Sequence, residues 1–290
     1  MASSEARVQD ATAQTGGVGG GSTRLVALRS FAEFLLPIVV LLLLWEAGVR
    51  TGLIDPTILP APSMIVGRAW VLLDPSHPER SLLLTHIAAS LWRALVAFAI
   101  ACGVAIPLGF ALGLSPIAYR SASPLLSLLL PLPAVAWTPI FLVGFGQGDT
   151  TIISVCFLGA VFPVLYATIR GVQSISPHSL WVVRSMGARR SDIFVRVLLP
   201  GCLPALISGL KLGMAHSWRT LVAAEMLAAL SRGLGYMIFA ARAYMDVSTM
   251  FVGIACLAVI GMLVEHGLFG PLESATVRKW YGVSRVGGAR

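Results

Sequence analysis

The chain has 290 residues, of which 57% are hydrophobic and only 12% are charged, whereas an ordinary soluble domain has about 25% charged residues. This composition excludes a typical soluble enzyme, a disulfide-rich secreted scaffold and a disordered protein. It predicts an all-α, polytopic membrane protein. The net charge of +8 does not indicate nucleic-acid binding, because no basic cluster is interleaved with aromatic residues.

Six apolar segments are long enough to cross a bilayer, which takes about 20 residues each. They cover roughly residues 31–49, 82–114, 124–145, 151–169, 203–230 and 249–269. We therefore expect a transmembrane domain over residues 31–275, between a disordered cytoplasmic tail (residues 1–30) and a second cytoplasmic tail (residues 276–290). Residues 64–73 are predicted to form a short helix at the membrane surface.

The arginines and lysines predict the orientation of the chain. With the N-terminus inside, thirteen of the 21 Lys and Arg residues lie on the inner side and five on the outer side. The remaining three, Arg93, Lys211 and Arg219, lie within apolar segments. Because cytoplasmic loops of membrane proteins carry the excess of positive charge, both termini are predicted to be cytoplasmic.

The longest inner connection, residues 171–200, is predicted to hold two helical pieces. The Ser-Pro pair at residues 176–177 suits the start of the first piece, and Gly187 supplies the left-handed residue that ends it. Ser191 can cap the second piece, which is expected to end before Pro200.

Leu180, Val183 and Met186 share one face of the first of these pieces, at a spacing of three residues. An amphipathic helix that joins two membrane spans on the cytoplasmic side suits docking to a cytoplasmic partner. The alternative is a surface helix that only covers the ends of the spans. The residues themselves favour neither interpretation.

Ionisable groups at membrane depth usually face a cavity or one another. Glu225 is the only acid deep in the fifth segment, and Arg93 on the second segment is its best candidate partner. The pair would lock two helices together, or else contact the solute directly. Arg93, Lys211 and Arg219 would together suit an anionic solute, but Lys211 and Arg219 can also extend to the membrane interfaces.

The third apolar segment contains several prolines, among them Pro131 and Pro133, and Trp137 follows them. Proline interrupts the hydrogen-bond ladder of a helix and leaves carbonyl groups free. We interpret this segment either as a mobile element lining a gate or as a static kink that serves packing.

Several motifs in chain order resemble one protein family. Gly187, followed after nine residues by Val197-x-Leu199-Pro200, resembles the second half of the EAA signature of the membrane subunits of binding-protein-dependent ABC importers. Residues 59–63, 130–139, 222–227 and 233–236 resemble motifs of the nitrate, taurine, alkanesulfonate and bicarbonate branch of that family. The chain departs from the signature at its Glu-Ala-Ala, where it has Trp181, Val182 and Val183.

The resemblance implies a type I ABC-importer-like permease fold in the bacterial inner membrane. It also implies two copies forming one path, a separate ATPase subunit that holds ATP and Mg²⁺, and an extracytoplasmic binding protein that delivers a small anion. No G-x-x-x-x-G-K-[ST] motif occurs in the sequence, so this chain is not expected to bind ATP through a P-loop. No catalytic residues, metal ligands or cofactors are expected in it. An ion-coupled secondary transporter, or a membrane scaffold without a transport role, are the alternatives.

The resemblance and the composition together give two sets of candidate site residues. The ATPase-coupling set is Pro177, Leu180, Trp181, Val183, Arg184, Met186, Gly187, Ala188, Arg189, Leu199 and Pro200. The set expected to line the translocation path or to lock helices is Arg93, Pro131, Pro133, Trp137, Trp218, Arg219 and Glu225.

Overall fold

The computed structural model describes residues 21–74 and 80–273. Within these residues the chain is helical and contains no strand. The predicted tails lie largely outside the described residues. The chain divides into two compact units, Met1–Met64 and Ile65–Arg290.

The first unit contains α2 (Gly21–Arg50). This helix begins inside the segment predicted as a tail and includes the first expected span. Near its end, Glu46 accepts hydrogen bonds from the Ser63 backbone N–H at 3.0 Å and from the Ser63 hydroxyl at 2.7 Å. These bonds fix the start of α3 (Pro62–Leu73), the short helix that the sequence predicted at 64–73.

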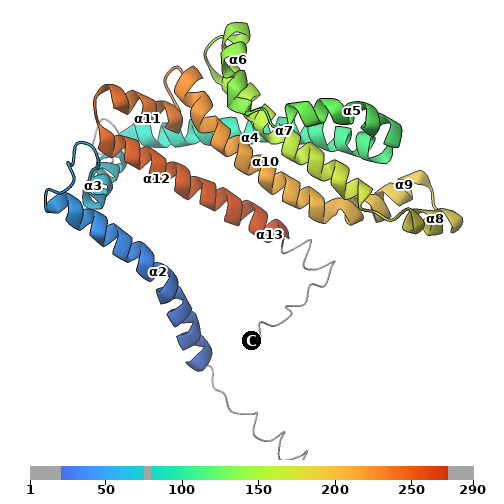
Figure 1. The fold of residues 1–290 in the computed structure, drawn as a ribbon, viewed down its shortest axis with the longest axis horizontal. Coiled ribbons are helices and arrows are strands. Elements are labelled where there is room, and N and C mark those ends of the chain that lie inside the picture. The colour runs from blue at the N-terminus through green and yellow to red at the C-terminus, as the bar shows by residue number, and fades with distance from the viewer. Residues whose placement is uncertain (1–20, 75–79, 274–290) are drawn as a thin grey trace, which may run out of the picture. The chain divides into compact units, whose positions relative to one another are not determined.

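The second unit holds the remaining helices of the described chain, shown in Figure 1. In chain order they are α4 (Arg80–Leu114), α5 (Pro116–Leu129), η1 (Ala134–Trp137), α6 (Thr138–Phe145), α7 (Asp149–Gln173), α8 (Pro177–Ser185), α9 (Arg190–Ile193), η2 (Phe194–Leu198), α10 (Leu199–Ala228), α11 (Leu234–Ala243), α12 (Val247–Leu263), η3 (Val264–Phe269) and α13 (Gly270–Glu273). Of the three η segments, η1 is a 3-10 helix, and η2 and η3 are π-helical.

Four stretches of the described chain are long and apolar enough to cross a membrane: Leu83–Leu114, Asp149–Gln173, Arg190–Ala228 and Val247–Gly267. A fifth candidate is the pair Pro116–Leu129 and Ala134–Phe145, which is bent by 85°. The third predicted segment, 124–145, is therefore not a straight helix. Its prolines at 131 and 133 interrupt the helical ladder between α5 and η1. The six-span count itself remains a prediction.

Helix α7 packs between α4 and α10 through small residues (Figure 1). A Cβ added at Gly113 of α4 would lie 2.8 Å from Val172 Cβ, and one at Gly213 of α10 would lie 2.6 Å from Val164 Cγ2. Since lipid tails are as apolar as side chains, helices in a membrane associate largely by such close packing. These glycines set how closely the three helices approach one another.

The second helical piece of the inner connection differs from the prediction. It begins at Arg190 with Arg189 as the N-cap residue, so Ser191 is not its cap, and it continues through Pro200 into α10. The π-helical segment η2 shifts the hydrogen-bond pattern just before Pro200. Proline is then in a first α-helical turn, where its missing N–H breaks no bond.

Asp246 begins α12 by accepting a hydrogen bond from the Thr249 backbone N–H at 3.0 Å. Arg68 of α3 lies 3.1 Å from the same carboxylate. Partial burial alone would raise the pKa of Asp246, but the hydrogen bonds from Thr249 and the Arg68 charge hold this pKa below its ordinary value. The ionised carboxylate therefore ties α3 to the start of α12.

Candidate functional site

The structure places the two charges predicted to pair, Arg93 and Glu225, in contact. Arg93 of α4 is 5% exposed, and its Nη1 lies 2.8 Å from Glu225 Oε1 on α10. The same guanidinium lies 2.7 Å from Asp149 at the start of α7 and donates to the Arg232 carbonyl at 2.6 Å. One cation thus joins three helices and the loop before α11.

The Glu225 carboxylate also holds the N-terminus of α11. It accepts a hydrogen bond from the Gly235 N–H at 2.9 Å and from the Ser90 hydroxyl at 2.8 and 2.9 Å. Ser90 in turn accepts from the Leu234 N–H at 2.8 Å. A carboxylate at a helix N-terminus is favoured by the free N–H groups there.

Two features of the loop before α11 make this arrangement fit. Gly233 has φ +134° and donates its N–H to His86 Nδ1 at 3.0 Å. A Cβ there would lie 2.5 Å from Glu225 Cδ, so only glycine fits. With Glu225 fully buried and its carboxylate oxygens already bonded to Arg93, Ser90 and Gly235, the geometry suits a helix lock rather than a solute-binding site.

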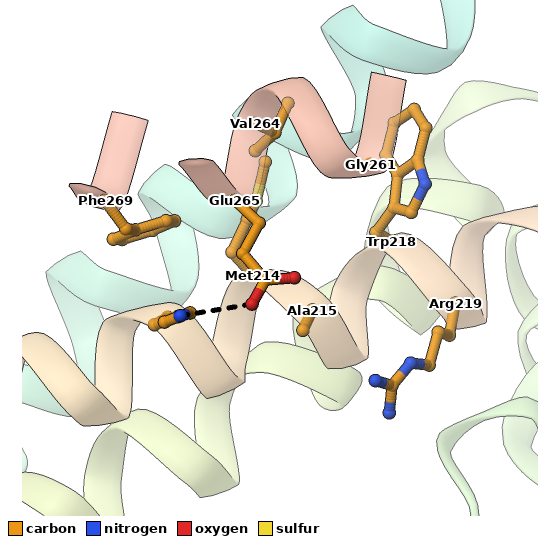
Figure 2. A pocket seen from close by; sticks show the side chains of 9 residues that line it. Met214, Ala215, Trp218, Arg219, Gly261, Val264, Glu265 and Phe269 are labelled. Carbon is orange, nitrogen blue, oxygen red and sulfur yellow. Dashed lines mark ion pairs between the residues drawn. The ribbon is translucent and has the colours of Figure 1, made fainter. Parts of the chain in front are cut away.

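A second intramembrane pair joins α10 to the end of α12. Lys211 Nζ lies 3.1 Å from Glu265 Oε1 of η3, the ion pair dashed in Figure 2. Trp218 donates its indole N–H to the Leu257 carbonyl at 3.2 Å, and Figure 2 shows it directed toward Gly261. Trp218 and Lys211 therefore fasten α10 to α12, whereas Arg219 points away from that contact.

The break between α5 and η1 covers a pocket of about 560 Å³. Pro131 and Pro133 line it, and so do His216 and Thr220 of α10. Trp137 lies half-buried at the end of η1 and does not line this pocket. The break between α5 and η1 thus leaves a hollow next to α10.

Helix α8 is anchored to the ends of the long helices by one of its faces. Leu180 and Val183 pack against a buried cluster, together with Ala188 and Leu199. The cluster contains Phe110 of α4, Val172 of α7, Ile193 of α9, Leu198 of η2 and Cys202 of α10. Gly187 follows with φ +79°, the left-handed conformation predicted for it.

The opposite face of α8 and the turn after it carry exposed apolar side chains. Trp181 is 69% exposed and Met186 is 81% exposed. Arg184 and Arg189 are also exposed, and each follows one of these apolar residues by three positions. Pro177 is also exposed at the first turn of α8, and Pro200 is half-buried within α10.

One predicted member of the inner face is on the outside. Met186 does not share the packed face of Leu180 and Val183, because the helix ends at Ser185 and Met186 is its C-cap residue. The helical period no longer applies beyond that point.

Sequence reasoning did not identify four residues as partners in the two ion-pair networks: Ser90, His86, Asp149 and Glu265. Ser90 and His86 lie three and seven residues before Arg93, and this spacing places all three on one face of α4. Asp149 gave no signal, since it lies at a helix start and is 61% exposed.

Comparison with known proteins agrees with this architecture. The family model described as "Binding-protein-dependent transport system inner membrane component" matches residues 105–266. The taurine transport system permease protein TauC of Escherichia coli K12 is 36% identical over 231 residues, which cover 80% of this chain and 84% of that protein. The putative aliphatic sulfonates transport permease protein SsuC of Bacillus subtilis 168 is 30% identical, over 85% of this chain and 86% of that protein.

The nitrate import permease protein NrtB of Leptolyngbya laminosa is 32% identical, over 74% of this chain and 78% of that protein. The matched region includes α7, α8 and α10 with the Gly187 turn between them. The chain therefore belongs to the family of inner-membrane permease components of binding-protein-dependent ABC transport systems.

Proposed function

We propose that the chain is the membrane-spanning subunit of an ATP-driven importer for a small anion. The solute would be taurine or an alkanesulfonate, or alternatively nitrate or bicarbonate. The ATP-driven role is supported by the two faces of the α8 region. The outer face presents Trp181 and Met186, and the inner face packs against the long helices. The names of the relatives support the solute class.

In this proposal each copy docks one ATPase subunit through α8 and the Gly187 turn. The partner's groove would be apolar with an acidic rim, because Trp181 replaces the signature's acidic residue and arginines flank it. ATP and Mg²⁺ would be held by that partner. Closure of the ATPase subunits would push on α8 as a rigid body, and the Leu180–Val183 packing would pass the motion to α7 and α10.

The remaining parts of the assembly follow from this orientation. The end of the second unit that carries α8 would be cytoplasmic, with both chain termini on that side. A solute-binding protein would dock at the opposite end, where α11 lies (Figure 1). Two copies of the chain would enclose the path between them.

Substituting Trp181 or Met186 by aspartate is expected to release the ATPase subunit from the full chain. Both side chains are more than two-thirds exposed, so the fold should tolerate the change. Loss of an aromatic anchor in an interface costs about 2 kcal/mol or more, which is roughly thirtyfold in affinity. The measurement is affinity purification of tagged chain from its native cells in mild detergent, with mass spectrometry of the proteins that remain bound.

The matched control is Tyr244→Asp, an aromatic residue that is 85% exposed after α11. We expect it to retain the ATPase fully. Equal retention of a P-loop ATPase by Trp181→Asp, Met186→Asp and Tyr244→Asp would rule out α8 as the docking element. A wild-type chain that purifies without any ATPase would reject the proposed function.

A further inference from the structure

The structure divides the cations inside the apolar segments into two kinds. Arg93 is neutralised by Glu225 and Asp149, and Lys211 is paired with Glu265. Arg219 makes no ion pair or hydrogen bond with any residue of the described part of the chain, and neither does the His216 side chain. The Arg219 and His216 side chains are therefore left with unused hydrogen-bonding groups.

These two residues lie on one exposed stripe of α10. The stripe is formed by Ser208, Leu212, His216, Arg219 and Ala223, at spacings of three or four residues. This spacing places them on one side of a helix. The first four side chains are exposed and Ala223 is half-buried. We refer to these five residues as the α10 stripe.

The α10 stripe lies at membrane depth. A Cβ at Gly213 would lie 3.7 Å from Phe98, which is near the middle of the Leu83–Leu114 span. Arg219 is six residues further along α10, about 9 Å, which is inside the roughly 15 Å half-thickness of a hydrocarbon core. His216 is closer still to the centre. An unpaired cation there requires water or an anion beside it.

Hollows lie on both sides of the stripe. His216 lines the pocket of about 560 Å³ beneath the break between α5 and η1. Arg219 lines a smaller pocket of about 100 Å³, whose wall includes Lys211 and Trp218 (Figure 2). Polar side chains beside hollows indicate a surface that faces water rather than lipid.

We propose that the α10 stripe faces the solute path and that Arg219, with His216 one turn away, binds the oxyanion group of the passing solute. A guanidinium presents donors in a planar fork that matches the oxygens of a sulfonate, carboxylate or nitrate group. Because Arg219 has no carboxylate partner among residues 21–74 and 80–273, the anion would supply the counter-charge that this part of the chain does not. The choice of a small oxyanion rests on the proposed function, whereas the water-facing stripe does not.

The same donors would also bind the phosphate of a lipid headgroup if the stripe faced the bilayer. The two sources differ in one measurable respect. A solute path exposes the stripe to water-soluble reagents along its length, whereas a lipid contact hides the neighbours of Arg219 from them.

The test uses cysteine reporters at two positions next to Arg219, His216→Cys and Ala223→Cys. They are made in the full chain with Cys102, Cys156, Cys202 and Cys256 replaced by alanine, and that background without a reporter gives the baseline. Membrane vesicles are treated with two methanethiosulfonate reagents, one ending in an ethylsulfonate and one in an ethyltrimethylammonium group. The first reagent itself carries the alkanesulfonate chemistry of the proposed solute.

Both reporters are expected to react. Once each rate is divided by that reagent's rate with free 2-mercaptoethanol, the sulfonate reagent is expected to be favoured over the cationic one at least about fivefold. A unit charge about 5–6 Å away, the spacing of adjacent turns, has an effect of this size in a partly hydrated site. The preference should disappear when Arg219→Gln is added to either reporter. Ile254→Cys, on an exposed part of α12 that we expect to face lipid, is the matched unreactive control.

Two results would overturn the inference: reporters as unreactive as Ile254→Cys, which is the lipid-facing outcome, or reactivity without a charge preference. Two reporters are used so that a fold defect of one variant leaves the other informative. Labelling requires no ATPase. A chain that labels as expected but shows no ATP-driven uptake would therefore keep this inference and reject the proposed function.

Discussion

Replacing Arg93 by glutamine is expected to lower the free energy of unfolding by about 3–5 kcal/mol, the usual result of removing one partner of a buried ion pair. The Glu225 side chain is 0% exposed and lies 2.8 Å from the guanidinium. Without Arg93 its charge would be buried with only neutral donors. The measurement is thermal or denaturant unfolding of the purified full chain in detergent.

The double variant Arg93→Gln with Glu225→Gln is expected to be more stable than Arg93→Gln alone. A neutral glutamine at 225 keeps an oxygen for the Gly235 N–H and the Ser90 hydroxyl and removes the uncompensated charge. Arg50→Gln is the control, since Arg50 pairs with Glu46 but its side chain is 71% exposed, and such pairs contribute about 0–1 kcal/mol. If the stability losses of Arg93→Gln and Glu225→Gln simply added in the double variant, this would contradict the conclusion that the Arg93–Glu225 ion pair holds α4 and α10 together.

Substituting Gly209 by valine is expected to destabilise the folded chain by about 3 kcal/mol, at the upper end of what overpacking usually costs. A Cβ at Gly209 would overlap the Cβ of Ala167 and lie 3.4 Å from the Pro163 carbonyl. The Ala167 Cβ and the Pro163 carbonyl oxygen are both fixed to the backbone of α7. Neither can therefore move unless α7 and α10 move apart. The loss of monodisperse protein in size-exclusion chromatography and a lower unfolding midpoint would report it.

Gly103→Val provides the matched control for this packing of α10 against α7. Gly103 is exposed on α4 and has no atom within 4 Å of an added Cβ. Gly103→Val therefore causes the same change in helix propensity as Gly209→Val, at a position where no other helix is in contact. If both valine variants lost equal stability, the small-residue packing of α7 against α10 would not be what holds these helices together.

Much of the fold was predictable because its determinants are local. The four long apolar segments, the left-handed Gly187 and the interruption at Pro131 and Pro133 each follow from residue types at one place in the chain. The Arg93–Glu225 contact was predictable for a different reason. A buried acid in a membrane helix must find a partner, and few cations were available.

What escaped prediction depended on non-local geometry. The continuation of the helix through Pro200 required the π-helical segment before it, which no simple periodicity indicates. The pairing of Lys211 with Glu265 depends on the crossing of α10 with the end of α12. It neutralises Lys211 but not Arg219, two cations that the sequence alone had grouped together.

The central claim is that ATP hydrolysed by a partner drives a small anion past this chain, and its most direct test is uptake in proteoliposomes. The vesicles would hold the full chain with its co-purified ATPase, and labelled taurine and ethanesulfonate would be supplied outside with the binding protein. The account predicts accumulation that requires ATP and persists when ionophores abolish all ion gradients. Accumulation driven by an ion gradient in vesicles that hold the chain alone, without ATPase or ATP, would contradict it.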